Sequence, residues 1–150
     1  MDQIVNPGRR QIDILLAKYA ESHLNHTNEI IHCICVPAIV FSLLGLLWTL
    51  HPLIALIATA LSLIYYIRLS LQFAGGMLVM AGVMLWLLQM TPLEMILPAS
   101  IGIFVVAWLG QFIGHKIEGK KPSFFDDLRF LLIGPLFVLS FLYRRLHIIY

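Results

Sequence analysis

Two clusters of polar side chains interrupt an otherwise apolar sequence, and both contain residue types that bind metal ions or transfer protons. The first cluster comprises His23, Asn25, His26, Asn28 and His32. The second lies within residues 108–118, which we place on a helix, where side chains at steps of three and four residues form one stripe. That stripe comprises Trp108, Gln111, His115 and Glu118. The sequence therefore predicts that an amide, an imidazole and a carboxylate share one helix face.

Histidines in this number indicate metal chemistry, because neutral imidazole is the commonest metal ligand in proteins. Histidines with one carboxylate and open coordination positions are typical of non-haem Fe(II) oxygen chemistry, and zinc accepts the same ligands. Glu118 could bind the metal, act as a general acid or base, or only orient His115 through a hydrogen bond. The residue types predict a metal site where the two clusters meet at one membrane surface, and spacing alone does not choose between iron and zinc.

The spacing of the first cluster requires a break in the backbone. His23 and His26 are one helical turn apart and can share a face, whereas His32 is nine residues beyond His23 and faces elsewhere on a continuous helix. A break between Asn25 and Asn28 would bring all three together. Asparagine can supply such a break, or it can cap the start of the first membrane helix.

The composition places the chain in a membrane. Hydrophobic residues make up 60% of the 150 residues and charged residues 12%, against roughly 45–50% and about 25% in soluble domains. We expect a single membrane-embedded helical domain over residues 1–150. A net charge of +2 with no basic block predicts no nucleic-acid partner. Nucleotide-binding and serine-hydrolase motifs are also missing from the sequence.

The apolar runs predict an all-α integral membrane protein with four transmembrane helices. A short amphipathic helix precedes them, and the first membrane helix begins near Asn28. A last apolar run, residues 130–143, is 14 residues long, and a full crossing needs roughly 17–25. We therefore expect a re-entrant or interfacial C-terminal segment rather than a fifth span. The four predicted spans are residues 34–50, 53–67, 73–90 and 93–113.

The lysines and arginines orient these spans. They precede the first span, lie between the second and third, and follow the fourth, while the turns near His51 and Thr91 carry none. By the positive-inside rule both ends of the four-helix core face the cytoplasm, in either a bacterial inner membrane or the endoplasmic reticulum. Both polar clusters then lie on the same side of the membrane.

The order of these residues resembles the Mpo-type 2-hydroxy fatty acid dioxygenase family, over nearly the whole chain. The motifs that carry the resemblance are Tyr19-x3-His23-x-Asn25-x2-Asn28-x3-His32-x4-Pro37, Trp108-x2-Gln111-Phe112-Ile113-Gly114-His115-x2-Glu118-x3-Pro122 and Gly134-Pro135-Leu136-Phe137-Val138. The resemblance implies an Fe(II)-dependent enzyme of fatty acid alpha-oxidation, which uses O2 to shorten a long-chain 2-hydroxy fatty acid by one carbon. The metal-binding positions that it implies are His23, His32 and His115, with His26 and Glu118 as further candidates. The catalytic candidates are Glu118, Gln111 and Asn28.

A long-chain 2-hydroxy acid could keep its hydrocarbon chain among the apolar helices while its carboxylate and hydroxyl reach the polar clusters. A hydroxyl and a carboxylate that bind the metal together would hold the reacting carbon beside it. Nearby cations would attract the carboxylate, although they are equally well explained as positive-inside anchors. The predicted substrate-binding residues are Trp108, Lys116, Lys120 and Arg129.

Two other functions fit the same residues. A non-enzymatic lipid-binding or scaffolding protein would use its histidines only to cap helices at the membrane interface. A zinc-dependent membrane hydrolase would use them as ligands but would keep its activity without O2. The oligomeric state does not follow from the sequence.

The charge pattern makes a prediction about topology. Reporter tags at the N-terminus and the C-terminus should both be found on the cytoplasmic side, because lysines and arginines flank both ends of the four-helix core. Protease protection of each tag in sealed vesicles measures this directly. A C-terminal tag on the opposite side would mean that residues 130–143 cross the membrane.

Overall fold

The fold is all-α, as the sequence predicts. A computed structural model of the chain describes residues 10–120 and 130–150, and no strand occurs within those two ranges. The helices are α1 (Gln11–Ala20), α2 (His26–Leu50), α3 (Pro52–Leu69), α4 (Leu71–Met90), α5 (Leu93–Glu118) and α7 (Gly134–Arg145).

The helices α2 to α5 are each long and apolar enough to cross a membrane, which confirms the four predicted spans. They extend past the predicted bounds because polar and aromatic residues at their ends also join the helices. The short amphipathic helix before them is α1. With 12 residues, α7 measures about 18 Å at 1.5 Å per residue, against about 30 Å of hydrocarbon in a bilayer. The interfacial or re-entrant assignment of the C-terminal segment therefore holds.

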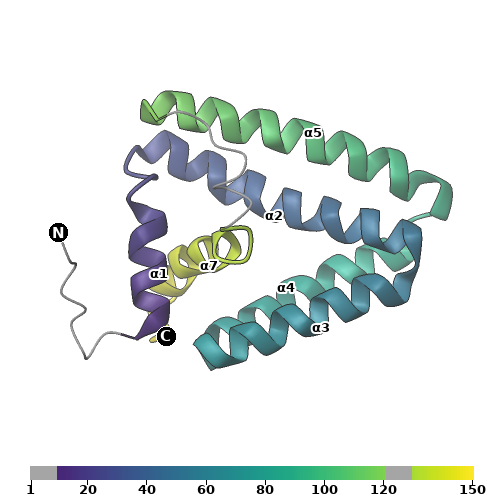
Figure 1. Ribbon diagram of the computed structural model, residues 1–150, viewed down its shortest axis with the longest axis horizontal. Coiled ribbons are helices and arrows are strands. Elements are labelled where there is room, and N and C mark those ends of the chain that lie inside the picture. Colours follow the sequence, from purple (N-terminus) through teal and green to yellow (C-terminus); the bar gives the residue numbers. More distant parts are fainter. Residues whose placement is uncertain (1–9, 121–129) are drawn as a thin grey trace.

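The four long helices form two pairs. α2 and α5 lie side by side along most of their lengths, and α3 and α4 form the second pair (Figure 1). The pairs meet where α2 turns into α3 and α4 into α5, and they diverge toward the other end (Figure 1). α7 lies between the diverging pairs and contacts α1, α2 and α4. The short helices α1 and α7 therefore fill the end of the molecule where the pairs separate.

Local signals in the sequence fix the helix ends. The side chain of Asn25 accepts a hydrogen bond from Thr27 N and caps α2, as the sequence suggested for these asparagines. His51 does the same for α3 by accepting from Leu53 N, with Pro52 in the first turn. α5 ends at Gly119, whose φ of 76° lies in the left-handed region that favours glycine. These caps place the polar residues of α2 and α5 at helix ends.

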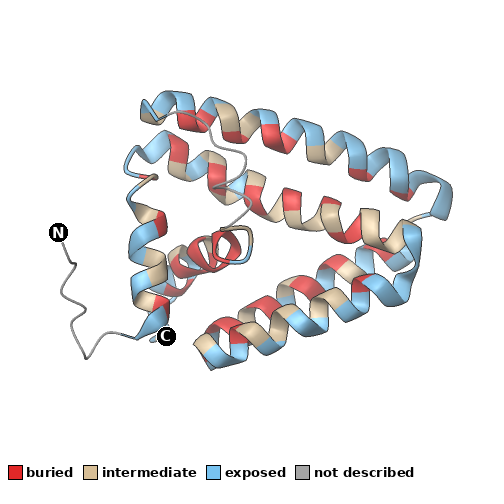
Figure 2. Cartoon of the chain, viewed as in Figure 1, coloured by how far each residue is buried: buried red, intermediate tan, exposed pale blue. Residues whose placement is uncertain are grey.

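Glycines let α2 and α5 approach closely, as the spacing of Gly110 and Gly114 suggests. A Cβ atom at position 110 would lie 2.6 Å from Cys35 Sγ, and one at position 114 would overlap Asn28 Oδ1. Buried residues lie where the helices face one another, and exposed residues lie on the outer faces (Figure 2). Many of the exposed residues are large and apolar, such as Leu61. Exposed apolar outer faces are expected where lipid is the solvent.

Hydrogen bonds of tyrosine hydroxyl groups join α7 and the segment before it to the pair formed by α3 and α4. Tyr66 on α3 donates a 2.9 Å hydrogen bond to the carbonyl oxygen of Leu132, and Tyr143 on α7 donates to the carbonyl oxygen of Gln72. Apolar side chains of α1, α4 and α7 pack around these contacts, and Phe73 stacks on Tyr143. The position of the C-terminal segment therefore depends on contacts with α3 and α4.

We predict that Tyr66→Phe lowers the free energy of unfolding by about 1 kcal/mol, because it removes one largely buried hydrogen bond. Thermal unfolding of the detergent-purified protein measures the change. Tyr65→Phe is the matched control, since no hydrogen bond of the Tyr65 hydroxyl occurs among the described residues. Equal effects of the two substitutions would contradict the role of the Leu132 contact.

Candidate metal centre

Three histidines from distant parts of the chain meet in the interior of the protein. His23 lies in the turn between α1 and α2, His32 lies on α2, and His115 lies in the last turn of α5. Their side chains are 6%, 0% and 5% exposed. One ligand atom from each lies within 4.8 Å of the other two, so that small movements of the rings would let all three reach one ion. We call these residues the histidine cluster.

The break between α1 and α2 makes this cluster possible. α1 ends at Ala20 and α2 begins at His26, so His23 leaves the helical path and its ring centroid lies 4.0 Å from that of His32. A break here agrees with the sequence, which also allowed His23 and His26 to share a face. They do not, because the side chain of His26 is 84% exposed and contacts Glu29 Oε2 at 3.2 Å. His26 therefore lies outside the histidine cluster.

Backbone carbonyl groups fix the proton positions of two of the rings. His23 Nδ1 lies 2.8 Å from the carbonyl oxygen of Tyr19, and His32 Nδ1 lies 3.0 Å from that of Asn28. A carbonyl oxygen only accepts hydrogen bonds, so each neutral imidazole carries its proton on Nδ1 and its lone pair on Nε2. This is the arrangement by which proteins orient metal-binding histidines. The two imidazoles therefore fit a metal ion.

Aromatic rings cover one side of the cluster. Tyr19 stacks on His23 with ring centroids 4.3 Å apart and an angle of 7° between the planes. Phe137, on α7, packs against both Tyr19 and His23. Neither residue is among the site candidates that the sequence predicts, although both stand in the motifs that carry the family resemblance. These rings exclude water from the side of the cluster that faces α7.

Glu118 joins the end of α5 to the start of α2 through hydrogen bonds. Its Oε1 accepts a 2.9 Å hydrogen bond from Leu24 N, and its Oε2 accepts from Asn25 N at 2.9 Å and from Asn28 Nδ2 at 3.0 Å. A carboxylate at the N-terminus of α2 is also favoured by the helix dipole. Among the described residues, the potential metal-binding group comprises the three histidines without Glu118. Of the roles considered for Glu118, these contacts favour a positioning role.

Two amides beside the cluster have buried atoms without a hydrogen-bond partner in the described part of the chain. These atoms are Asn28 Oδ1, next to Gly114, and Gln111 Nε2, one turn before His115 on α5. Buried polar atoms of this kind are uncommon, and a bound water, ion or ligand usually satisfies them. Both amides are therefore available for further contacts next to the histidine cluster.

The remaining candidates lie around the cluster. Trp108 is buried and lines a small cavity together with Gln111 and Tyr19. Lys116 and Lys120 are exposed, and Lys120 Nζ donates to the carbonyl oxygen of Glu21. Their side chains thus lie at the surface near the cluster rather than within it. Arg129 lies outside the described residues.

Comparison with known proteins identifies the family of the chain. The family model described as "2-hydroxy-palmitic acid dioxygenase Mpo1-like" matches residues 10–146. The chain belongs to the Mpo1-like family. It is 31% identical over 137 residues to the 2-hydroxy-palmitic acid dioxygenase MPO1 of Saccharomyces cerevisiae, covering 86% of this chain and 78% of the yeast protein. No solved structure matches the chain. The family assignment confirms the resemblance drawn from the sequence motifs.

We predict that Gly114→Ala destabilises the protein and disturbs the histidine cluster. The new Cβ would overlap Asn28 Oδ1, and Asn28 cannot easily move because its Nδ2 donates to Ser22 and Glu118. Overpacking of this kind costs roughly 1–3 kcal/mol. Thermal unfolding and bound-metal content are the two measurements.

Gly102→Ala is the matched control on the same helix, because its Cβ would meet no atom within 4 Å. It should leave both quantities unchanged. If Gly114→Ala behaves like this control, the close contact between α2 and α5 does not support the cluster.

Proposed function

We propose that this protein is an Fe(II)-dependent dioxygenase that acts on 2-hydroxy fatty acids and shortens them by one carbon with O2. The observation that carries the proposal is the histidine cluster, with three buried imidazoles from three separate segments. Two of them have the tautomer that metal binding requires. The name of the yeast relative supplies the substrate class.

The reaction balances without an external reductant. One 2-hydroxy acid and one O2 give the acid shortened by one carbon, one CO2 and one water. The bond between C1 and C2 breaks, C1 leaves as CO2, and the carbon that carried the hydroxyl is oxidised to the new carboxyl group. Ferrous iron, held by His23, His32 and His115, would supply the one-electron chemistry that lets an organic substrate react with O2.

The side chains around the cluster have separable tasks in this proposal. The buried amide of Gln111 would donate a hydrogen bond to the carboxylate or hydroxyl of the substrate, because its Nε2 has no partner in the described ranges. Tyr19 and Phe137 would keep water away from the reacting carbon. Lys116 and Lys120, exposed near the cluster, would attract the anionic head group from the aqueous side.

A zinc-dependent hydrolase remains the second candidate, for one specific reason. Glu118 accepts three hydrogen bonds, so that among the described residues the ligand group contains three histidines and no carboxylate. Three histidines and a water also form a well-known catalytic zinc site. A requirement for O2 separates the two functions, since hydrolysis needs none.

We predict that His115→Ala removes bound iron and reduces O2 consumption with 2-hydroxyhexadecanoic acid by at least about a thousandfold, to background. The variant loses one of three ligands in a buried site, whereas the fold keeps its other contacts. Elemental analysis after anaerobic loading with Fe(II) and an oxygen electrode are the two measurements. Product analysis should find pentadecanoic acid.

His26→Ala is the matched control, because His26 is exposed and lies outside the cluster. It should keep both iron and activity, as should alanine at His51, which caps α3 far from the cluster. Folded protein that retains zinc rather than iron and consumes no O2 with the hydroxy acid would favour the zinc hydrolase. Folded wild-type protein that binds no metal would favour the lipid-binding or scaffolding protein.

A further inference from the structure

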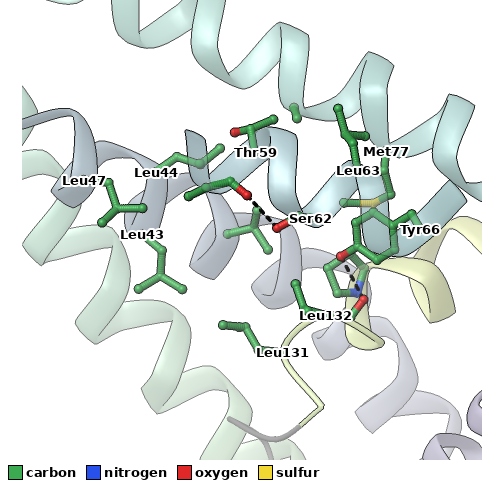
Figure 3. A pocket seen from close by; sticks show the side chains of 14 residues that line it. Leu43, Leu44, Leu47, Thr59, Ser62, Leu63, Tyr66, Met77, Leu131 and Leu132 are labelled. Carbon is green, nitrogen blue, oxygen red and sulfur yellow. Dashed lines mark hydrogen bonds between the residues drawn. The ribbon is translucent and has the colours of Figure 1, made fainter. Parts of the chain in front are cut away.

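A second feature of the fold lies away from the histidine cluster. Between α2, α3 and α4 there is a cavity of about 170 Å³, which we call the interhelical cavity. Leucines of α2 face Thr59 and Ser62 of α3 across it, and Leu131 and Leu132 lie at one side (Figure 3). Since about 10–15 Å³ is enough for one water molecule, this space can hold a ligand of many atoms.

The lining of the interhelical cavity is a hydrocarbon surface despite its hydroxyl groups. Thr59 donates to the carbonyl oxygen of Ala55, Ser62 to that of Ala58, and Tyr66 to that of Leu132. Each hydroxyl proton is therefore used within the protein, and none of the described residues that line the cavity is charged. The chemistry of this space fits an unbranched hydrocarbon chain and offers nothing to a polar head group.

A smaller cavity of about 20 Å³ lies next to residues that neighbour the histidine cluster. It is lined by Tyr19, which stacks on His23, by Gln111, one turn from His115, and by Val36, one turn from His32. Leu131 lines this small cavity as well as the interhelical cavity. With room for little more than one water, the small cavity would be a narrow neck on any route between the two sites.

We propose that the interhelical cavity holds the hydrocarbon chain of the acid whose head group lies at the histidine cluster, and that Leu131 lines the passage between them. This inference rests on the proposed function. It names the residues that select the length of the acyl chain. It assigns the cavity to the substrate rather than to a bilayer lipid, because the small cavity that shares Leu131 with it is lined by neighbours of the histidines.

The dimensions agree with a long-chain acid. Leu47, at the far end of the cavity lining on α2, is 15 residues beyond His32, which is about 22 Å along the helix axis. With C–C bonds of about 1.52 Å and angles near 111°, an extended chain advances about 1.25 Å per carbon. The path from the cluster to Leu47 therefore accommodates about 17 carbons. Shorter chains would leave its far end unused.

Ala58 provides a test of chain length. α2 and α3 are joined at His51, so Ala58 on α3 lies opposite Leu44 on α2, about 18 Å along α2 from His32. A larger side chain there would obstruct a chain of sixteen carbons but not one of eight. We expect Ala58→Phe to lower kcat/KM for 2-hydroxyhexadecanoic acid at least about tenfold relative to 2-hydroxyoctanoic acid, since even one misplaced methylene costs about that much.

Ala60→Phe is the matched control, two residues away on the exposed side of α3. It should leave the ratio of the two kcat/KM values within about twofold of the wild type. If the two phenylalanine variants give the same ratio, the interhelical cavity does not hold the chain and the proposal is overturned.

A binding measurement on the unmodified protein tests the same proposal without requiring turnover or a stable variant. A 2-hydroxyhexadecanoic acid with a diazirine at its last carbon is photolysed with the protein in phosphatidylcholine nanodiscs, and the labelled peptides are sequenced by mass spectrometry. Labels should fall on cavity residues of α2 and α3, with unlabelled 2-hydroxyhexadecanoic acid in excess reducing them at least about tenfold.

The outcomes separate this proposal from the proposed function. Labelled cavity residues in a protein that consumes no O2 would support the chain site and contradict the dioxygenase. O2 consumption together with labels only on the outer faces of the helices would support the dioxygenase and contradict the chain site. If a phosphatidylcholine with the same diazirine labels the cavity as strongly as the acid does, a bilayer lipid fills it and the proposal is overturned.

Discussion

The hydrogen bonds of Glu118 are the constraint on which the site depends. Its carboxylate accepts from the backbone of Leu24 and Asn25 and from the side chain of Asn28, and so ties the last residue of α5 to the turn before α2. Hydrogen bonds to a charged acceptor are roughly twice as strong as neutral ones. Because His23 lies in that turn and His115 on the last turn of α5, the same contacts bring the two histidines together.

Polar groups inside a membrane protein are costly unless they are satisfied. Asn28 is held by several contacts: its Nδ2 donates to Ser22 and Glu118, and its backbone carbonyl oxygen accepts from His32 Nδ1. The residue whose side chain donates to Glu118 thus also sets, through its backbone carbonyl group, the tautomer of His32 that would bind the metal. A substitution at Asn28 would remove the two side-chain contacts, whereas the contact with His32 belongs to the main chain.

The sequence predicted the four spans and the fold class because long apolar runs and helical periodicity are local signals. From the charge asymmetry and the family resemblance, the sequence also predicted that His23, His32 and His115 lie on one side of the membrane and bind one metal. It misplaced His26, because the face of a side chain beside a helix break depends on backbone angles that composition does not fix. Stacking of Tyr19 on His23 and the cavity between α2 and α3 depend on tertiary packing, which no local pattern encodes.

The short C-terminal helix α7 explains how one small fold contains both the polar histidine cluster and the apolar interhelical cavity. α7 is too short to cross a bilayer, so it lies between the two helix pairs, with Phe137 against the histidine cluster. The residues just before it, Leu131 and Leu132, line the interhelical cavity. A fifth spanning helix would close the bundle along its whole length and leave no such space. An amphiphilic substrate needs both environments within one molecule's length, and a helix that ends inside the bundle provides them.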